Sequence, residues 1–346
     1  MDAVILAGGR SSRLYPLTLN RPKVLMPLLD RTLIDHLLEK VREAGIRQVT
    51  VVADRASQEA LRTVVMRYVG RLRCTVVVQP EPLGIADAML WARPNVDSEH
   101  FVLILADNLF TAPLDSLWED FDPHQAAGRL WVTQVDDPSR FGIVETDAEQ
   151  NILRLVEKPK TTPSNLAICG IYLLPQRIFE LAEEHRPAEG EFEITPLLQL
   201  LHEERRLDYR LLPGDWEDAG TLLGFLRAQW LLLKRLPEEN QQHVHQSARI
   251  ENSTLMGPVW IGPHCEVVES RVGPNVALIG NVALRGVRVS NCTFMNGVRL
   301  IGAPPGAEIE RSILGVGARL TLHPGRYEDL MLADYSELTA MPIAGG

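Results

Sequence analysis

Residues 6–14 read Leu6-Ala7-Gly8-Gly9-Arg10-Ser11-Ser12-Arg13-Leu14 and extend an apolar segment that begins at residue 3. A buried strand that runs into a loop rich in Gly and Ser presents backbone N–H groups to phosphate oxygens. Gly8 and Gly9 allow close approach of the backbone to a ligand, and Arg13 adds positive charge. The stretch matches neither GxxxxGK[ST] nor GxGxxG, which excludes a P-loop ATPase and a dinucleotide-binding dehydrogenase. It predicts an α/β fold with a different kind of phosphate-binding loop.

The segments that follow alternate between apolar and amphipathic patterns. Strands are expected at residues 3–6, 48–53, 74–78, 101–105 and 130–135. Continuous apolar runs of this kind suit a sheet that is covered on both faces. Helices are expected at residues 32–44, 57–69 and 85–92. The alternation predicts a doubly wound, mostly parallel, Rossmann-like sheet, whose ligands bind at the carboxyl ends of the strands.

The composition changes near residue 236. Residues 1–236 contain 12 Gly and all five Lys, whereas residues 237–346 contain 13 Gly and no Lys. We therefore expect two domains, a catalytic domain at 1–236 and a repeat domain at 237–346. The segment between them is polar, as linkers are.

The second part of the chain repeats. Ile250-Glu251 recurs as Val268-Glu269, and Trp260-Ile261-Gly262 recurs at the same offset as Leu278-Ile279-Gly280. That offset equals three hexapeptides, or one turn of a parallel β-helix of triangular section. The residues expected to stack inside are Ile261, Val267, Val272, Leu278 and Leu284. The period loosens after residue 285, which indicates irregular coils and only four or five turns.

The overall composition excludes several classes of protein. Hydrophobic residues make up 45% of the 346 residues and charged residues 23%, which is typical of a folded globular protein. No apolar run reaches the ~18–20 residues of a membrane span. Asp2 stands where a signal peptide carries bases, so we expect a cytoplasmic protein without a membrane partner. The net charge of −10 argues against a nucleic-acid-binding surface.

Lysine is rare in this chain, since only five of its 35 basic residues are Lys. Lys23 follows Arg13 along the same N-terminal segment, and Lys158 follows Glu157. Because Arg is the default surface cation here, each of these Lys positions is a candidate for a specific role. The four cysteines show no metal-ligand spacing and are interpreted as reduced thiols.

Short polar motifs follow one another along the first two-thirds of the chain. They are Pro16-Leu17-Thr18, Arg21-Pro22-Lys23, residues 79–88, Ala106-Asp107-Asn108, Phe141-Gly142, Glu157-Lys158-Pro159, and residues 167–172, 189–195 and 216–221. Each motif has a purely structural explanation by itself, such as a turn after a strand at Asp107. Their order resembles that of the sugar-1-phosphate nucleotidyltransferases. The chain is most similar to long forms of glucose-1-phosphate thymidylyltransferase that carry a C-terminal left-handed β-helix.

This resemblance implies a set of site residues. The nucleotide-binding residues would be Leu6, Ala7, Gly8, Gly9, Gln79, Pro82 and Gly84. The sugar-phosphate-binding residues would be Asn108, Gly142, Glu157, Lys158, Gly170 and Tyr172. The catalytic residues would be Arg13, Lys23, Asp107 and Asp218, with the two aspartates as Mg²⁺ ligands. Ser11 stands where the family has glycine.

The implied reaction needs no general base. An oxygen of the sugar-1-phosphate, already ionised at neutral pH, attacks the α-phosphorus of a nucleoside triphosphate, and pyrophosphate leaves in line. Catalysis then rests on positioning and charge neutralisation. Arg13 is expected to hold the β- and γ-phosphates, Lys23 the α-phosphate and Lys158 the sugar phosphate.

Several alternatives stay open at this stage. The transferred group is expected to be thymidylyl, with uridylyl, guanylyl and adenylyl transfer as alternatives. A second alternative is an added acetyltransferase in the β-helix, with His243, His264 or His323 as its base. A third is a non-catalytic regulatory subunit, which the presence of Arg13, Lys23 and both aspartates opposes. We also expect a homo-oligomer, formed through the β-helix, the catalytic domain or both.

Overall fold

The computed structural model describes residues 1–9, 12–204, 207–237, 241–303 and 306–339. Ser11, the departure from the family glycine, lies outside these residues. Two compact units make up the chain. The first comprises Met1–Arg10 and Ile34–Trp216, and the second comprises Ser11–Leu33 and Glu217–Gly346. The expected division of the chain into two domains, 1–236 and 237–346, stays a prediction.

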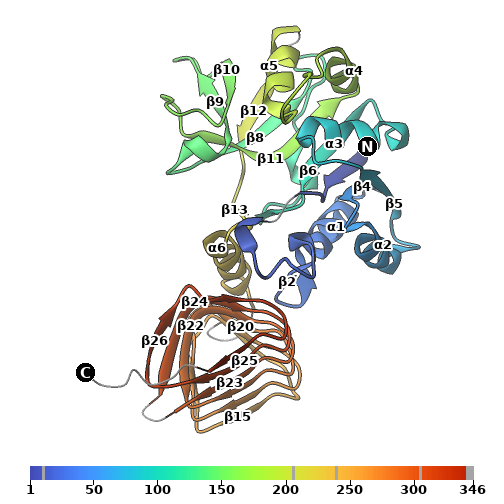
Figure 1. Ribbon diagram of the computed structural model, residues 1–346. Helices are drawn as coiled ribbons and strands as arrows, with labels where there is room; N and C mark the ends of the chain where they lie inside the picture. Colours follow the sequence, from blue (N-terminus) through green and yellow to red (C-terminus); the bar gives the residue numbers. More distant parts are fainter. Residues whose placement is uncertain (10–11, 205–206, 238–240, 304–305, 340–346) are drawn as a thin grey trace. The chain divides into compact units, whose positions relative to one another are not determined.

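The first unit is built on one mixed sheet with the order β10-β9-β11-β6-β1-β4-β5 (Figure 1). Off this path, β8 pairs with β11, and β12 pairs with β8. Its strands are β1 (Asp2–Leu6), β4 (Gln48–Asp54), β5 (Arg73–Gln79), β6 (His100–Leu105), β8 (Arg129–Gln134), β9 (Gly142–Thr146), β10 (Ile152–Glu157), β11 (Leu166–Pro175) and β12 (Asp208–Leu211). β1 runs parallel to β4 and β6, and β4 runs parallel to β5. β11 runs antiparallel to β6, β8 and β9. The expected strands are confirmed. The loop with Gly8 and Gly9 follows β1, one of the parallel strands.

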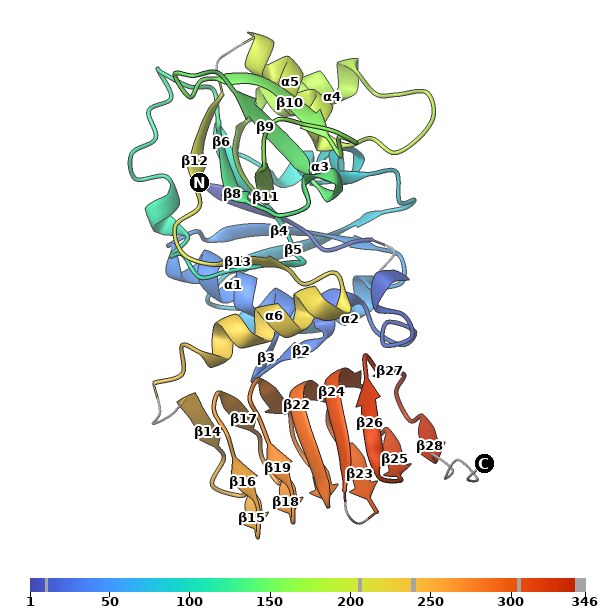
Figure 2. The same ribbon diagram turned by 90° about the vertical axis from the view of Figure 1, so that its left-hand side faces the viewer.

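Helices cover both faces of the parallel strands. Figure 2 shows α1 and α2 on one side of β4 and β5, and α3 on the other. The helices are α1 (Leu33–Glu43), α2 (Gln58–Val65), α3 (Ile85–Ala92), α4 (Arg177–Glu184), α5 (Ile194–Glu204) and α6 (Leu222–Leu233). The expected helix at 57–69 is shorter in the structure, because the chain tightens into a 3₁₀ turn at Met66–Tyr68. None of the described helices is long and apolar enough to cross a bilayer.

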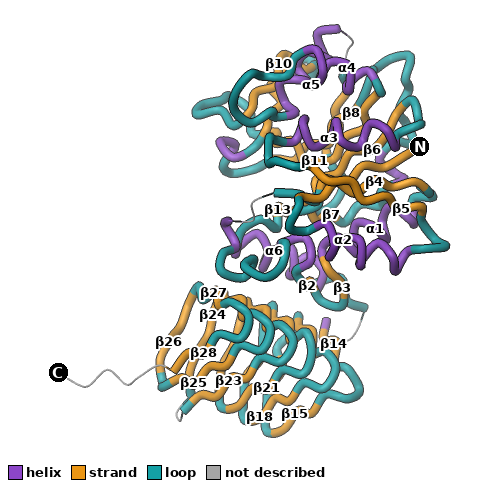
Figure 3. The backbone as a smooth tube through the Cα atoms, turned by 45° about the vertical axis from the view of Figure 1, so that its right-hand side comes forward, coloured by secondary structure: helices purple, strands orange, loops and turns teal. Residues whose placement is uncertain are grey.

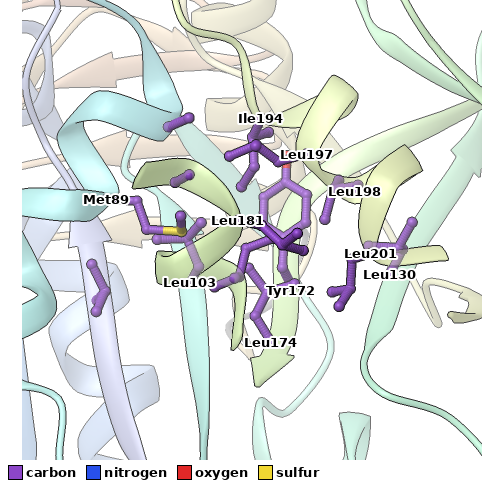
Figure 4. Close-up of a cluster of buried hydrophobic side chains, with 14 of the residues drawn as sticks. Met89, Leu103, Leu130, Tyr172, Leu174, Leu181, Ile194, Leu197, Leu198 and Leu201 are labelled. Atoms are coloured by element: carbon purple, nitrogen blue, oxygen red, sulfur yellow. The ribbon is translucent and has the colours of Figure 1, made fainter. Parts of the chain in front are cut away.

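One cluster of buried apolar side chains in the first unit lies between the sheet and helices α3 to α5. Figure 4 shows part of this cluster, in which Met89, Leu103, Leu181 and Leu198 meet Tyr172 of β11. Truncation of such a fully buried Leu to Ala costs about 2–5 kcal/mol. The packing therefore holds the strand ends, and the loops that follow them, in one place.

The second unit is a parallel β-helix, whose stacked coils alternate strands and turns (Figure 3). One face has six strands in the order β15-β18-β21-β23-β25-β28. The strands of the coils are β14 (Gln242–Val244), β15 (Arg249–Glu251), β16 (Thr254–Leu255), β17 (Val259–Ile261), β18 (Glu266–Val268), β19 (Arg271–Val272), β20 (Val276–Leu278), β21 (Ala283–Arg285), β22 (Val287–Phe294), β23 (Arg299–Gly302), β24 (Ala307–Leu314), β25 (Arg319–Leu322), β26 (Gly325–Glu328), β27 (Met331–Leu332) and β28 (Glu337–Thr339). The aliphatic residues expected inside are at most 1% exposed, which confirms their stacking.

The expected period of three hexapeptides is wrong for most coils. Ile250 pairs with Val267, one position short of that period, and Ile261 pairs with Leu278 at the same shorter spacing. The spacing shortens again where β20 pairs with β22, lengthens from β22 to β24, and equals three hexapeptides from β24 to β27. The expected match paired Ile250 with Val268, whereas the structure pairs Ile250 with Val267. Adjacent residues of a strand point to opposite faces, so Val268 points outwards when Val267 points inwards.

Helix α6 and the N-terminal segment also belong to the second unit. Gln229 of α6 is fully buried and donates from Nε2 to the backbone oxygens of Asn275 and Cys292, each at 3.1 Å. Its Oε1 accepts a hydrogen bond from Thr293 at 2.5 Å. Buried polar groups satisfied on both sides fix one packing arrangement. Leu29, from the N-terminal segment, clusters with Leu233 and Ala277 in the same unit.

That segment has short elements only. They are η1 (Ser12–Leu14), η2 (Lys23–Leu25), β2 (Pro27–Leu28) and β3 (Arg31–Thr32). The other short elements of the described residues are β7 (Asn108–Phe110), β13 (Trp216–Asp218), η4 (Arg93–Asn95), η5 (Asp115–Leu117) and η6 (Pro138–Arg140).

Candidate functional site

The carboxyl ends of the parallel strands meet at one edge of the first unit. Leu6, at the end of β1, pairs with Val52 and Leu105, and Asp54, at the end of β4, pairs with Gln79. A Cβ added to Gly8 would lie 3.3 Å from the Asp54 nitrogen, so the glycine lets its loop lie against β4. Gly9 and Asp107 follow β1 and β6 at the same edge. The topology thus brings Gly8 and Gly9 to the edge where ligands of parallel sheets bind.

Gln79 is held in one orientation by a buried carboxylate. Its Nε2 donates to Asp87 Oδ2 at 2.9 Å and to the Gly84 oxygen at 3.1 Å. Asp87 is 1% exposed and also forms an ion pair with Arg186. An ionised carboxylate only accepts hydrogen bonds, so the amide of Gln79 must turn its NH₂ towards Asp87. The role of Asp87 was not predictable from the motif at 79–88, because its partner Arg186 is far away along the chain.

Gly84 has a structural role that the sequence did not reveal. It caps α3 with φ of +106°, and an added Cβ would lie 2.5 to 2.7 Å from the backbone of Phe192. Phe192 donates to the Leu83 oxygen at 2.6 Å and accepts from the Ala86 nitrogen at 2.9 Å. The segment at 79–88 is therefore joined to the segment at 189–195. Contact of Gly84 and the exposed Pro82 with a nucleotide stays a prediction.

A second cluster of charged residues surrounds Glu157 at the end of β10. Glu157 Oε2 accepts a hydrogen bond from Thr195 Oγ1, and Glu157 Oε1 lies 3.1 Å from Lys158 Nζ. Lys158 also forms an ion pair with Glu193. A Cβ added to Gly142 would lie 2.6 Å from Thr195 Oγ1 and 3.2 Å from Glu157 Oε2. The structure thus brings Gly142, Glu157 and Lys158 together.

Thr195 and Glu193 belong to the motif at residues 189–195, for which no individual roles were predicted. Their signal was the motif itself, which the structure places beside Glu157. Partial burial lowers the pKa of Lys158, but the hydrogen bond and charge of Glu193, with those of Glu157, more than offset this. The net pKa of Lys158 is raised, so the side chain is cationic at neutral pH, and half of it is exposed to solvent. It is available to an anionic ligand.

Three further predicted sugar-phosphate residues belong to two strands of the first unit. Asn108 begins β7, and Gly170 and Tyr172 lie in β11. A Cβ added to Gly170 would collide with Asn108 Nδ2, and that amide donates to the Leu105 oxygen at 3.3 Å. Tyr172 is 4% exposed in the apolar cluster of Figure 4, and burial raises its pKa. The described position of Tyr172 is that of a core residue, and its contact with a sugar stays a prediction.

Trp216 is the last residue of the first unit. Its Nε1 donates to the Cys169 oxygen at 2.9 Å, and its ring packs edge-on against Phe141 at 5.7 Å. This packing fixes the start of the motif at 216–221.

The other three catalytic candidates lie in the second unit. Arg13 of η1 is half exposed, and its guanidinium lies 3.8 Å from Asp218 Oδ2. Asp218 Oδ1 accepts from the Gly220 nitrogen at 2.8 Å, and a Cβ at Gly220 would lie 2.9 Å from Arg13. Lys23 begins η2 after Pro22, whose φ is −61°. Arg13 and Asp218 thus form one group of opposite charges.

The chemistry of the donors decides which metal the site suits. Among the described residues, no group of three or more His, Cys, Asp or Glu side chains is arranged to hold an ion. Mg²⁺ in phosphate-transfer sites takes one or two carboxylates and completes its shell with phosphate oxygens and water. Asp107 of the first unit and Asp218 of the second each offer the carboxylate oxygens that this ion prefers, and their joint role as ligands stays a prediction. They do not amount to a cage made of protein ligands alone.

The three histidines considered as acetyltransferase bases have structural surroundings. His243 stacks on Trp260 with 3.8 Å between the ring centres. His264 has φ of +56° at a corner of the coil, and the backbone oxygen of His323 accepts from Tyr327 Oη at 3.2 Å. Within the described ranges, these contacts do not join the three side chains into one site.

The sequence profile described as nucleotidyl transferase matches residues 2–235 of the chain. A glucose-1-phosphate thymidylyltransferase from Streptomyces antibioticus is 30% identical over 355 residues, which cover 98% of this chain and 99% of the relative. Mannose-1-phosphate guanylyltransferase 1 from Arabidopsis thaliana is 31% identical and covers 87% of this chain and 82% of its own. A solved structure from Bacillus anthracis, assigned as glucose-1-phosphate thymidylyltransferase with bound sucrose, has a TM-score of 0.64 and 30% identity. That comparison covers 69% of this chain and 98% of the other.

Proposed function

We propose that this chain, which belongs to the nucleotidyl transferase family and is a sugar-1-phosphate nucleotidyltransferase, makes dTDP-glucose from dTTP and glucose-1-phosphate. The observation that carries the choice is the similarity to a thymidylyltransferase along 98% of the chain, through the β-helix. Comparable identity to a mannose-1-phosphate guanylyltransferase keeps guanylyl transfer as the first alternative. Uridylyl and adenylyl transfer would follow the same mechanism.

The hydrogen bonds of Gln79 support a base with a ring N–H. Both N–H groups of its amide are directed at protein acceptors, Asp87 and Gly84, so Oε1 is the atom that can accept from a base. Thymine, uracil and guanine carry an N–H donor in the ring, whereas adenine and cytosine present a ring nitrogen acceptor there. This supports dTTP, UTP or GTP over ATP and CTP.

We assign the phosphates of the nucleotide to two groups of residues. The backbone at Leu6 to Gly9 would donate to phosphate oxygens, as a loop after a buried strand does. Arg13 would hold the β- and γ-phosphates, and Lys23 would neutralise the α-phosphate. The attacking oxygen is already ionised, so these cations lower the barrier by stabilising charge that develops on the phosphoryl oxygens.

Asp107 and Asp218 would hold a divalent cation, which we propose to be Mg²⁺ supplied with the triphosphate. When bound, this ion would supply charge neutralisation and orientation for the triphosphate. The Gly220 nitrogen holds Asp218 Oδ1 and so orients the other oxygen. Arg13, 3.8 Å from Asp218, keeps this carboxylate paired before substrate binds.

The cluster around Glu157 would bind the sugar-1-phosphate. Thr195 holds one carboxylate oxygen of Glu157, which leaves the carboxylate oriented to accept from sugar hydroxyls. Lys158 would exchange its contact with Glu193 for the incoming phosphate. A cation stored between two carboxylates is placed before the substrate arrives, which reduces the cost of reorganisation. Asn108, Gly170 and Tyr172 would complete the wall of this subsite.

A matrix of substrates tests the proposal. The purified chain is incubated with MgCl₂ and each of ATP, CTP, GTP, UTP and dTTP, against glucose-, mannose-, galactose- and glucosamine-1-phosphate, and pyrophosphate release is followed. We expect the highest kcat/KM for dTTP with glucose-1-phosphate. A higher value for GTP with mannose-1-phosphate would replace thymidylyl by guanylyl transfer. Addition of acetyl-CoA with glucosamine-1-phosphate tests the bifunctional alternative in the same assay.

We further propose that the protein is a homo-oligomer. The end strands of a β-helix present unpaired backbone groups that another copy or a cap must cover. Light scattering coupled to size-exclusion chromatography measures the mass, and a monomer at micromolar concentration would contradict this.

A further inference from the structure

Arg21 connects the segment that carries Lys23 to the last coils of the β-helix. Its Nη2 lies 2.5 Å from Asp334 Oδ2, and its Nη1 lies 3.4 Å from Met295 Sδ. These residues all belong to the second unit, although Arg21 and Asp334 are 313 positions apart. The side chain of Arg21 is 20% exposed and that of Asp334 is 6% exposed. The pair is therefore more shielded from water than the surface ion pairs of this chain, and screening weakens it less.

The coil holds Asp334 in a fixed position. Asp334 follows β27, and its Oδ1 accepts from the Val316 nitrogen of the preceding coil at 2.8 Å. A Cβ added to Gly315 would lie 2.7 Å from Asp334 Oδ1, so glycine leaves the room that the carboxylate needs there. The two oxygens of Asp334 have different partners, the coil backbone on one side and Arg21 on the other. The carboxylate cannot turn without losing both.

The chain between Arg21 and Lys23 is short and stiff. Pro22 fixes its own φ at −61° and precedes η2, in which the Leu25 nitrogen donates to the Pro22 oxygen at 3.0 Å. Val24 and Met26, on either side of Leu25, are at most 1% exposed. Arg21 Nε is buried and has no hydrogen-bond partner among the described residues, so the guanidinium is held in place by its two terminal nitrogens. Only Pro22 separates Arg21 from Lys23, so the backbone between them has little freedom.

We propose that Arg21 and Asp334 are positioning residues that hold Lys23 where the α-phosphate binds. The C-terminal coils then contribute to catalysis through this ion pair, in addition to any part in assembly. The inference rests on the proposed function in one respect, the assignment of Lys23 to the α-phosphate. Neither Arg21 nor Asp334 is required to touch the substrate.

Asp334→Asn is the sharpest variant. The Asn oxygen can still accept from Val316, which directs the new NH₂ group at Arg21 and sets two donors against each other. Glu337→Gln is the matched control, because it makes the same chemical change in the same coil. Glu337 is exposed and pairs with the exposed Arg319, at 3.4 Å. Arg21→Met removes the contact from the other side and keeps an apolar stem for packing.

The position of Lys23 is measured directly by amine labelling. Because the chain has only five Lys, acetylation of each by acetic anhydride is followed by peptide mass spectrometry, without nucleotide and with each of the five nucleoside triphosphates plus MgCl₂. Lys160, an exposed residue, is the internal reference. In the wild type we expect the nucleotide that supports turnover to slow the labelling of Lys23 about tenfold, as a bound phosphate shields its partner amine.

In Asp334→Asn we expect this protection to be lost, together with a fall in kcat of about 100-fold, the size typical of a misplaced catalytic group. The KM for the sugar-1-phosphate should match that of Glu337→Gln, and circular dichroism at the assay temperature should show that both variants are folded. Equal protection and equal kcat in Asp334→Asn and wild type would overturn the inference while leaving the proposed function intact. If no nucleotide protects Lys23 in the active wild type, the α-phosphate assignment fails, and the inference fails with it. If Asp334→Asn does not fold, the protection of Lys23 and the kcat of Arg21→Met test the inference in the same way.

Discussion

Gln79 donates its side-chain amide to Asp87 across 2.9 Å, and Asp87 is in turn paired with Arg186. This relationship turns an amide that can present either end into one that presents its oxygen. Asp87 would therefore act on base choice without contact with the base.

Asp87→Asn should relax the choice of base. An Asn can donate as well as accept, so the amide of Gln79 is no longer held with its NH₂ inward. We expect the ratio of kcat/KM for dTTP over ATP to fall about tenfold, the effect of one unsatisfied hydrogen bond. Trp91→Phe is the control, since Trp91 Nε1 also donates to Asp87 Oδ2, at 3.3 Å, while its removal leaves the carboxylate in place for Gln79. An unchanged ratio in Asp87→Asn would exclude this role.

Lys23→Ala should lose turnover while the fold is kept. Removal of a cation from the α-phosphate takes away charge stabilisation that matters most in the transition state, so we expect kcat to fall about 100- to 1000-fold. Lys160→Ala removes an exposed Lys and should leave kcat unchanged. Circular dichroism and pyrophosphate release are the measurements. Activity of Lys23→Ala within about threefold of wild type would contradict the assignment.

Asp218→Asn should weaken the dependence on Mg²⁺. The Asn oxygen can still accept from Gly220, so the local turn survives while the charged ligand is lost. We expect the Mg²⁺ concentration for half-maximal activity to rise about tenfold or more, because the metal prefers anionic oxygen. Asp30→Asn, at an exposed carboxylate of the N-terminal segment of the same unit, is the control. Identical Mg²⁺ titrations for Asp218→Asn and wild type would remove Asp218 from the metal site.

Lys158→Met should raise the KM for the sugar-1-phosphate about tenfold or more and leave the KM for the nucleotide unchanged. The loss has two causes. The phosphate loses its cation, and Glu193 and Glu157 then face it without the Lys between them. The double variant Lys158→Met with Glu193→Gln should regain part of the affinity, because one repulsive charge is gone. No recovery would show that Glu193 does not face the phosphate.

The thiols should react slowly in the native protein at pH 8. Burial raises the pKa of Cys74 to about 11, and it also raises the pKa values of Cys169, Cys265 and Cys292. Only the thiolate reacts, so Ellman's reagent should label the native chain slowly and the unfolded chain fully. A pKa raised by folding adds stability that is complete below the ordinary value of 9.0. For Cys74 that stability is lost as the pH rises from 9 towards 11.

The thiol prediction has its own control. Cys74→Ala should flatten the loss of unfolding free energy between pH 9 and 11, as measured in urea. Fast labelling of Cys74 at pH 8 would show that the position is open to solvent.

The strands of the first unit were predictable because each is a local apolar run. The end of α2 was not, since the pattern of buried residues continues from Gln58 through Tyr68 while the backbone changes from an α-helix to a 3₁₀ turn. Periodicity reports which face is buried, and the two helix types bury similar faces over one turn.

In the β-helix, the residues facing inwards were predictable and the coil length was not. Val267 and Leu278 are inside as expected, but the spacing between stacked partners differs from one pair of coils to the next. Coil length depends on the turn at each corner, where residues such as Asn252 and Asn291 adopt positive φ. Those turns tolerate insertions. The apolar pattern of the stacked strands does not indicate how long each turn is.

The motifs predicted Gln79, Glu157 and Lys158 as site residues, because these residue types suit bases, sugars and phosphates. Asp87, Thr195 and Glu193 hold those residues in place, and the sequence did not assign them. Two of these contacts cross long stretches of chain, 35 residues for Lys158 and Glu193 and 38 for Thr195 and Glu157. Partners at that separation are set by packing.

By itself, the sequence determined the elements of this protein: a parallel α/β sheet with its Gly-rich loop, a Gly-rich β-helix, and the types of residue that suit nucleotidyl transfer. These follow from backbone preferences and burial patterns that act over a few neighbouring residues. Only the tertiary structure decided which partners orient the site residues, and that Arg21 meets Asp334 at the far end of the chain. Such contacts depend on how whole elements pack, and no local pattern contains that information.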